Sequence, residues 1–275
     1  MEKLEAALAK AREMRKSAVG GGDVVRSRTV AAAAPVATTG WEDLPEVTIS
    51  PEMAMRNRIT ALQGGKNAAP YDMLRSRTIR MMKDKGWTRL AVTSPEAGCG
   101  KSTVALNLAV SLGRQKDLKV MLLDLDLRRP SLHRTLGHTP EKSLHDYLAG
   151  EAEFEQTAVR IGANCLVSLN ATYSHRPAEL LQSQAARDAL DAAERRYKPD
   201  LILFDMSPML ASDDNLGFLG NVDCAILVAA AETTTLPNID ICEKEIAQLT
   251  NVLGVVLNKC RYSDDSVGYD YGMYE

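Results

Sequence analysis

A glycine-containing loop between an apolar segment and a helical segment most constrains what this chain can fold into. The loop covers residues 94–103 and reads Ser-Pro-Glu-Ala-Gly-Cys-Gly-Lys-Ser-Thr, after the apolar run 89–93. Gly98 and Gly100 let the backbone turn tightly and point its N–H groups inward. The helix that follows adds a favourable field for phosphate. This order of strand, loop and helix predicts a phosphate-binding P-loop.

The end of this loop predicts how a nucleotide is held. Lys101 is expected to hold the β- and γ-phosphates, Ser102 to ligate Mg²⁺ and Thr103 to reach the α-phosphate. Pro95 stands where the strict G-x-x-x-x-G-K-[ST] pattern has its first glycine, so a glycine-capped turn is the alternative interpretation. The predicted nucleotide-binding residues of the loop are Gly98, Cys99, Gly100, Lys101, Ser102 and Thr103.

Two later apolar segments each end in aspartate. Residues 119–123 lead into Asp124, with Asp126 two residues on, and residues 201–204 lead into Asp205. Parallel sheets bind ligands at the carboxyl ends of their strands. One of Asp124 and Asp126 is expected to hold Mg²⁺ through water and the other to accept a hydroxyl proton, as phosphoryl transfer requires. Asp205 is expected to orient the Mg²⁺ through its water shell, and solvated loop acids are the alternative.

Apolar segments alternate with amphipathic helical segments through the middle of the chain. Continuous apolar strands are typical of a sheet that is covered on both faces. The alternation therefore predicts an α/β fold with a parallel sheet flanked by helices. Strands are expected at residues 89–93, 119–123, 165–169, 201–204, 224–229 and 253–257, and helices at 71–85, 101–114, 177–197 and 237–250.

The chain is expected to have four parts. These are a short helix over residues 1–18, a linker and irregular segment over 19–70, a globular domain over 71–261 and a flexible tail over 262–275. The tail carries half of the eight tyrosines among glycines and aspartates, and it has too few aliphatic residues to order itself. Such a tail suits delivery of a phenol to another subunit, although a merely sticky tail is the alternative. The expected phosphate acceptors are Tyr262, Tyr269, Tyr271 and Tyr274.

Composition narrows the possible classes of protein. A formal net charge of −3 gives no support to a nucleic-acid partner. The five cysteines are scattered, without a C-x-x-C pair, which favours a reducing cytosol. No stretch approaches the roughly 18 apolar residues of a membrane span, and the first residues lack the order of a signal peptide. The cytoplasm is therefore the expected location.

Three motifs and the tyrosine tail resemble the bacterial tyrosine kinase family, called BY-kinases, over roughly residues 70–275. The motifs read S-P-E-A-G-C-G-K-S-T, L-L-D-L-D-L-R-R-P and L-F-D-M-S-P. Most telling is the apolar strand followed by D-x-D-x-R, complete here as Asp124, Asp126 and Arg128. The family is involved in polysaccharide synthesis and export, and it shares its P-loop NTPase architecture with the ParA and MinD ATPases.

The resemblance implies roles for individual residues, with ATP and Mg²⁺ as cofactors. The glycine loop corresponds to the Walker A motif, Asp124 and Asp126 to Walker A′, and Asp205 to Walker B. Asn258, after the last predicted strand, corresponds to the residue that reads adenine. The catalytic residues so implied are Lys101, Asp124, Asp126 and Asp205, and the metal-binding residues are Ser102, Asp124 and Asp205. Which of the first two aspartates is the base stays open.

The sequence also departs from the family. Cys99 stands where an acidic residue is common, and residues 205–208 read Asp-Met-Ser-Pro in place of Asp-Thr-Pro-Pro. The helix before the loop only approximates the E-x-x-R-x-x-R pattern that the family uses for ring assembly. The residues that approximate it are Asp72, Arg75, Arg77 and Arg80.

The expected function is that of an ATP-dependent tyrosine autokinase that modifies its own C-terminal tyrosines in trans and regulates exopolysaccharide or capsule synthesis or export. The expected partners are its own subunits, in an assembly that could be a ring, and a membrane-embedded activator of polysaccharide assembly that holds this stand-alone chain at the inner face of the membrane. Two alternatives stay open. One is a ParA/MinD-like ATPase switch, a class that carries lysine at the position of Glu96, and the other is a nucleotide-binding scaffold without transfer activity.

Overall fold

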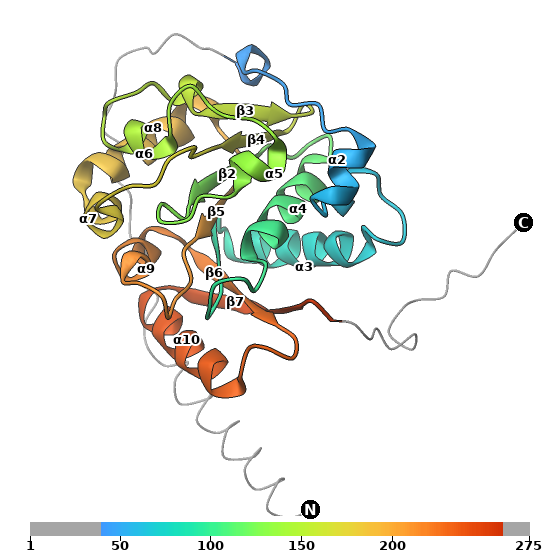
Figure 1. Ribbon diagram of the computed structural model, residues 1–275, viewed down its shortest axis with the longest axis vertical. Coiled ribbons are helices and arrows are strands. Elements are labelled where there is room, and N and C mark those ends of the chain that lie inside the picture. The colour runs from blue at the N-terminus through green and yellow to red at the C-terminus, as the bar shows by residue number, and fades with distance from the viewer. Residues whose placement is uncertain (1–39, 261–275) are drawn as a thin grey trace, which may run out of the picture. The chain divides into compact units, whose positions relative to one another are not determined.

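The computed structural model describes residues 40–260 (Figure 1). The helix predicted over residues 1–18 and the tail predicted over 262–275 lie outside the described residues, and so do the four tyrosines expected as acceptors. Within residues 40–260, no helix is both long and apolar enough to cross a membrane.

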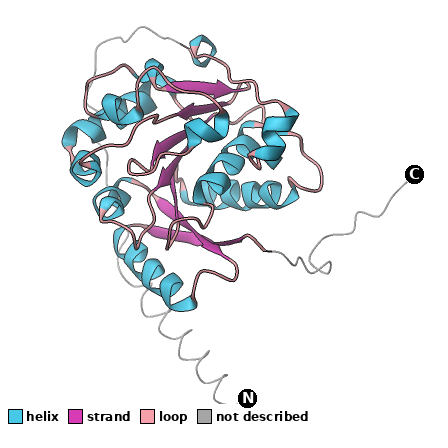
Figure 2. Ribbon diagram, viewed as in Figure 1, coloured by secondary structure: helices cyan, strands magenta, loops and turns pink. Residues whose placement is uncertain are grey.

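A seven-stranded sheet lies at the centre of the described residues, drawn in magenta in Figure 2. Its strands are β1 (Arg89–Thr93), β2 (Val120–Leu125), β3 (Ala158–Ile161), β4 (Cys165–Ser168), β5 (Leu201–Met206), β6 (Cys224–Ala230) and β7 (Asn251–Asn258). Their order is β3-β4-β2-β5-β1-β6-β7, and every neighbouring pair is parallel except β3 with β4. This confirms the predicted α/β fold.

Helices cover both faces of the sheet (Figure 1). They are α2 (Pro51–Arg56), α3 (Ala69–Lys85), α4 (Lys101–Gly113), α5 (Leu132–Leu136), α6 (Leu144–Leu148), α7 (Pro177–Gln182), α8 (Gln184–Tyr197), α9 (Asp214–Phe218) and α10 (Leu236–Leu249), with short 3₁₀ turns at Trp41–Asp43, Thr60–Leu62, Phe154–Gln156 and Leu219–Asn221. In one core, Leu122 of β2 packs together with Leu108 of α4. In the other, the adjacent Met121 packs together with Leu190 of α8. Successive strand residues therefore face opposite helical layers.

The short helices α2, α5 and α9 are not among the helices expected from the sequence, and two further elements differ from the prediction. The antiparallel strand β3 is not expected from the sequence, because it is only four residues long and includes the half-buried Arg160. The single helix predicted over residues 177–197 is two helices, because Ser183 has an extended backbone. The Ser183 hydroxyl accepts a hydrogen bond from the N–H of Ala186 at 3.0 Å and so caps α8.

Residues 40–70 belong to the domain, so the linker predicted over residues 19–70 is wrong for this part. The buried side chains of this segment include Trp41, Leu44, Ile59, Ala61 and Ala68. The indole N–H of Trp41 also donates to the backbone carbonyl of Tyr197 at 2.7 Å. The prediction fails because the apolar residues are widely spaced and pack one by one, so no helical or strand period reveals them.

The residues that approximate the ring-assembly pattern lie on α3. The Asp72 carboxylate accepts a hydrogen bond from the Ser111 hydroxyl of α4 at 2.6 Å and pairs with Arg75 at 2.9 Å. Arg77 and Arg80 are exposed. Half of the pattern therefore stabilises the packing of α3 on α4, and its part in subunit assembly stays a prediction.

Candidate active site

The glycine loop joins β1 to α4 with a strongly turned backbone. Gly98 and Gly100 have φ angles of +84° and +91°, which favour glycine. A Cβ atom on Gly100 would also overlap the side-chain amide of Asn258. That amide donates to the carbonyl of Cys99 at 2.9 Å. Asn258 therefore lies against the phosphate loop, and its contact with adenine stays a prediction.

Glu96 holds the other side of the loop against the segment between β6 and α10 and against the first turn of α10. One carboxylate oxygen accepts a hydrogen bond from the amide of Asn238 at 2.5 Å, and the other from the hydroxyl of Thr234 at 3.2 Å. The Cys99 sulfur lies 3.5 Å from the same hydroxyl and is 2% exposed. Sequence reasoning missed Thr234 and Asn238, because uncharged polar residues at the start of a helix carry no signal of a distant partner.

Asp124 and Asp205 lie side by side because β2 and β5 are neighbours in the sheet and pair these residues in register. Both side chains are fully buried. Within the described residues, none of their four carboxylate oxygens has a hydrogen-bond partner. Burying two carboxylates without hydrogen bonds is costly unless cations compensate their charge. The pair therefore fits Mg²⁺, which prefers oxygen ligands.

A magnesium site here would take only part of its ligands from the chain. Residues 40–260 contain no group of three or more His, Cys, Asp or Glu side chains that could hold a metal ion. Magnesium commonly keeps several waters and binds through one or two carboxylates together with substrate phosphates. Asp124, Asp205 and the nearby Ser102 hydroxyl match that incomplete donor set.

Lys101 enters the acidic cluster from the first turn of α4. Its Nζ lies 2.7 Å from Oδ2 of Asp126 and 3.7 Å from Oδ1 of Asp205. Burial lowers the pKa of Lys101, but the charges of Asp205 and Asp126 outweigh burial and raise it. Burial, together with the charge of Asp205, raises the pKa of Asp124 well above its ordinary value. One lysine therefore faces three carboxylates, and the remaining negative charge favours a divalent cation.

β2 carries Asp124 and β5 carries Asp205, and Arg128 of the D-x-D-x-R motif connects the segments that follow these two strands. Its Nε and Nη2 donate to the two oxygens of Asp214 at 2.7 and 2.9 Å. Asp214 is 1% exposed and also accepts from the Ser212 hydroxyl at 2.9 Å. A bidentate pair of this kind fixes relative orientation. Sequence reasoning missed Asp214, because an acid at the start of the short helix α9 looks like an ordinary helix-start residue.

The loop after β4 is held against the end of β2 at two points. The amide of Asn170 donates to the backbone carbonyl of Asp124 at 2.6 Å. The backbone N–H of Ser174 donates to the carbonyl of Leu127 at 2.9 Å. The backbone on both sides of Asp126 is therefore fixed by neighbouring segments.

The structure brings the predicted site residues of the described part to one edge of the sheet. These residues lie in or beside the glycine loop and at the ends of β2, β5 and β7. They are Gly98, Cys99, Gly100, Lys101, Ser102, Thr103, Asp124, Asp126, Asp205 and Asn258. This arrangement can hold a nucleotide phosphate chain between backbone N–H groups and a carboxylate cluster.

Known proteins share this arrangement. A model of the ParA-type family described as NUBPL iron-transfer P-loop NTPase matches residues 87–274, which is more than half of the chain. Tyrosine-protein kinase YwqD of Bacillus subtilis is 30% identical over 225 residues, covering 80% of this chain and 92% of YwqD. EpsB of Ralstonia nicotianae is 31% identical over 70% of this chain but only 26% of its own length.

The chain thus spans 26–30% of the length of the longer curated relatives EpsB and AmsA.

Among solved structures, the kinase domain of the Escherichia coli tyrosine kinase ETK superposes with a TM-score of 0.68 at 28% identity, covering 78% of this chain and 84% of that domain. The chain belongs to the ParA-type P-loop NTPases and, within them, to the bacterial tyrosine-protein kinase family.

Proposed function

We propose that this protein binds ATP and Mg²⁺ and transfers the γ-phosphoryl group to tyrosines near the C-terminus of neighbouring copies. By this activity it would regulate the synthesis or export of an extracellular polysaccharide. The observation that carries the proposal is the cluster of Lys101, Asp124, Asp126 and Asp205 beside the glycine loop. The tyrosine-protein kinases among its relatives support it.

The chain's own residues would bind the nucleotide phosphates. The N–H groups of the glycine loop point toward them, and Lys101 contacts the β- and γ-phosphates. Asp124, Asp205 and Ser102 would hold the metal ion. Bound there, Mg²⁺ neutralises charge that develops on the phosphate oxygens.

We assign the role of general base to Asp126. Without nucleotide, its carboxylate pairs with Lys101 at 2.7 Å. Nucleotide phosphates compete for that lysine, which leaves the Asp126 carboxylate able to accept a proton. The tyrosine O–H then gives its proton to Asp126 while the phenolic oxygen bonds to the γ-phosphorus. The bond between that phosphorus and the bridging oxygen breaks, and ADP leaves.

The ATPase-switch alternative is less consistent with the contacts of Glu96. That class carries a lysine at this position, whereas both carboxylate oxygens of Glu96 are used within the chain.

The partners we propose are further copies of this chain, in an assembly that could be a ring, and a membrane-embedded activator that holds the protein at the inner membrane face.

The test is incubation of the purified full-length protein with Mg-ATP, with and without membranes that contain the activator. Mass spectrometry should find phosphotyrosine at Tyr262, Tyr269, Tyr271 or Tyr274, and the Lys101→Met variant should show none. Mixing inactive Lys101→Met chains with active chains truncated after Arg261 should place phosphate on the inactive chains. Nucleotide turnover without any tyrosine labelling would instead support the ATPase switch, and nucleotide binding without turnover would support the scaffold.

A further inference from the structure

The sheet has two edge strands, β3 and β7, and within residues 40–260 the chain covers only the edge at β3. There, the backbone N–H of Arg160 donates to the carbonyl of Pro45 at 2.9 Å, and the N–H of Val47 donates to the carbonyl of Arg160 at 2.9 Å. At the opposite edge, no strand of the described residues lies beyond β7 (Figure 1). β7 is therefore the edge at which a further strand can pair.

β7 lacks the features that usually keep an edge strand from pairing. Its eight residues, 251–258, include no charged residue and no proline. Its pairing with β6 is irregular only near the start of the strand. Val255 and Leu257 lie on one face of β7 and are 46% and 60% exposed. An uncharged edge with exposed apolar side chains indicates a surface that another segment covers.

The backbone of β7 directs hydrogen-bonding groups outward at the same two residues. The carbonyl of Asn258 accepts a hydrogen bond from the N–H of Ala231, which follows β6, at 2.8 Å. Asn258 therefore directs its backbone groups toward β6. Because successive strand residues direct these groups to alternate sides, those of Val255 and Leu257 point away from β6. The Cys260 thiol lies 3.8 Å from the carbonyl of Leu257, a weak contact that a paired strand would replace.

The start of α10 extends this apolar surface. Val255 is in register with Leu227 of β6, which belongs to the core between the sheet and α10. Val255 and Leu257 therefore face the α10 side of the sheet. Leu236, the first residue of α10, is 76% exposed and follows the segment that bonds to the end of β7. We call the surface of Leu236, Val255 and Leu257 the β7 edge surface.

The C-terminal segment of the chain has a sequence pattern that fits the β7 edge surface. Residues 267–273 read Val-Gly-Tyr-Asp-Tyr-Gly-Met, so apolar or aromatic residues alternate strictly with small or acidic ones. Such alternation is typical of a strand with one apolar face. The preceding residues 263–266 read Ser-Asp-Asp-Ser and favour a turn. A segment with so few aliphatic residues forms a strand only when an existing sheet supplies the partner.

The place where this segment begins favours pairing within one chain. Lys259, directly after β7, has a φ angle of +61°, which is uncommon for a residue other than glycine and typical of turns. A loop over residues 259–266 would bring residues 267–273 back along β7 in the antiparallel direction. Closing such a short loop costs little, and the covalent connection gives the segment a high effective concentration at its own β7.

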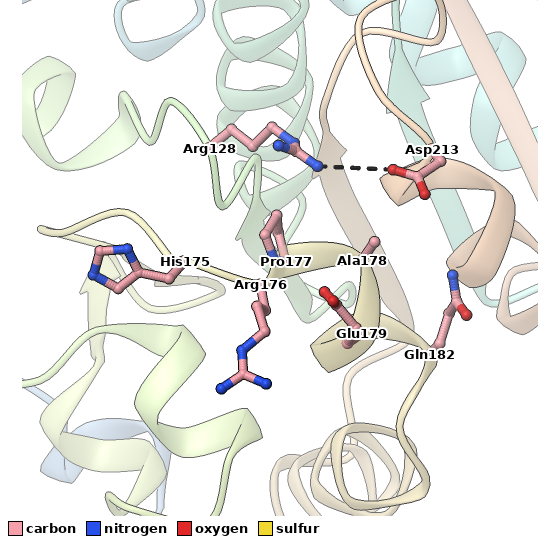
Figure 3. A pocket seen from close by; sticks show the side chains of 8 residues that line it. All are labelled: Arg128, His175, Arg176, Pro177, Ala178, Glu179, Gln182 and Asp213. Carbon is pink, nitrogen blue, oxygen red and sulfur yellow. Dashed lines mark ion pairs between the residues drawn. The ribbon is translucent and has the colours of Figure 1, made fainter.

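The pocket beside Arg128 does not compete for this segment through its charge. Figure 3 shows Arg128 and Arg176 in its lining together with Glu179 and Asp213. Arg128 is already paired with Asp213 at 3.7 Å. The two acids balance the two arginines, so the pocket has no net attraction for the aspartates of the segment.

We propose that, in the unphosphorylated protein, residues 267–273 pair with the free edge of β7 of the same chain as an antiparallel strand. The face that carries the tyrosines would cover the β7 edge surface. The docking itself does not depend on the kinase function. Its consequence for the labelling of tyrosines rests on that proposed function.

The consequence is that docking controls which tyrosines are available to other copies. Tyr269 and Tyr271 lie on the face that would be covered, so the segment must detach before another copy labels them. A phosphate on either tyrosine would return to an apolar surface beside α10, whose exposed acids Asp240 and Glu243 outnumber the exposed Lys244 in that stretch. The added negative charge opposes this return. Phosphorylation therefore keeps the segment detached.

The first test measures docking without any kinase activity. It compares hydrogen exchange in a full-length Lys101→Met chain with exchange in the same chain truncated after Arg261. The amides of Val255 and Leu257 should exchange about tenfold more slowly in the full-length chain, as expected for a segment docked about nine-tenths of the time. The amides of β1, in the middle of the sheet, should exchange equally in both chains.

Proline in the segment provides the matched variant. Val267→Pro together with Asp270→Pro removes a backbone donor toward β7 in either register, so exchange should become as fast as in the truncated chain. Equal exchange at Val255 and Leu257 in the full-length and truncated chains would overturn the proposal. Slower exchange that depends on protein concentration would place the segment of a second copy on β7 and would overturn the pairing within one chain.

The second test measures the effect of docking on labelling. The acceptor is the full-length Lys101→Met chain, and the enzyme is an active chain truncated after Arg261. Leu257→Glu in the acceptor should release the segment and raise the initial rate of labelling about five- to tenfold, because only the detached fraction can react. Met55→Glu, at a residue of α2 that is 83% exposed, introduces the same charge away from β7 and should leave the rate unchanged.

The two tests separate this inference from the kinase function. An unchanged rate for the Leu257→Glu acceptor would show that docking does not withhold the tyrosines, although the kinase function would stand. An equal increase for Met55→Glu would overturn the same conclusion. If no acceptor is labelled under any condition, the kinase function fails, and the exchange of Val255 and Leu257 still decides whether the segment docks.

Discussion

Arg128 and Asp214 form a bidentate ion pair that links the end of β2 to the segment after β5. Lysine has a single ammonium group and cannot reproduce this fork geometry. Arg128→Lys should therefore let the segment after β2, which carries Asp126, shift relative to the segment after β5. We expect kcat to fall about ten- to a hundredfold, because small misplacements of reacting groups have effects of this size. Autophosphorylation rates at saturating ATP measure the change.

The neighbouring Arg129 provides a matched control, because it is exposed and its side chain makes no ion pair within the described residues. Arg129→Lys should retain the wild-type rate. An equal loss in both variants would show that the Arg128–Asp214 pair does not position the site.

The buried pair of Asp124 and Asp205 predicts a gain of stability when one carboxylate is removed. Asp124→Asn should stabilise the nucleotide-free protein by about 1–2 kcal/mol, because it removes uncompensated buried charge. Each 1 kcal/mol should raise Tm by about 2–4 °C in a domain of this size. The further rise in Tm that Mg-ATP gives to the wild type should be lost. Asp117→Asn, at an exposed loop, is the control and should change neither value.

Asp126→Asn separates the proposed base from nucleotide binding. Removal of a general base lowers the rate by about 10²–10⁴-fold. Lys101 would no longer be held by the Asp126 carboxylate at 2.7 Å, so affinity for ATP should be kept or increased. Single-turnover phosphorylation and ATP calorimetry measure the two effects. Wild-type rates in this variant would assign the base role elsewhere, with Asp124 as the next candidate.

The parts of the site that sequence could predict are those encoded by short local patterns. An apolar run that ends in aspartate predicts Asp124 and Asp205, and a glycine loop before a helix predicts Lys101. These patterns work because buried parallel strands need continuous apolar residues and bring their carboxyl ends to one edge. The same continuity explains why all six predicted strands are present.

The parts that sequence could not predict depend on partners far along the chain. Arg128 and Asp214 are 86 residues apart, and Asn238 and Glu96 are 142 residues apart. Each is a common polar residue in an ordinary local context, so only the folded backbone reveals the pair. Trp41 escapes prediction for a related reason, since a lone aromatic residue in a polar segment has no period.

Asp72 should make stability depend on pH. Burial raises the pKa of Asp72, but the hydrogen bond from Ser111 and the charges of Arg114 and Arg75 outweigh burial and lower it. The ionised carboxylate therefore stabilises the folded state above about pH 4, and this contribution is lost as pH falls through the lowered folded-state pKa. Asp72→Asn should cost about 1 kcal/mol at pH 7.

Urea titrations at pH 7, 5 and 4 measure the dependence. The deficit of Asp72→Asn should persist down to about pH 4 and shrink below it. Asp84→Asn is the control on the same helix, because Asp84 is 68% exposed and lies 3.9 Å from the exposed Arg80. A deficit of equal size for Asp84→Asn would show that the network between α3 and α4 adds nothing specific.

Glu96 and Asn238 allow a test in which donor and acceptor are exchanged. Asn238→Asp places two carboxylates in contact, and the first turn of α10 should move away from the glycine loop. We expect a weaker affinity for ATP by about five- to thirtyfold, equivalent to about 1–2 kcal/mol. In the double variant with Glu96→Gln, the glutamine amide can donate to the carboxylate introduced at position 238, while its oxygen accepts from Thr234. The double variant should therefore recover most of the affinity, as measured by calorimetry on proteins of equal Tm. If the single and double variants bind ATP equally weakly, the contact between Glu96 and Asn238 does not couple the glycine loop to α10.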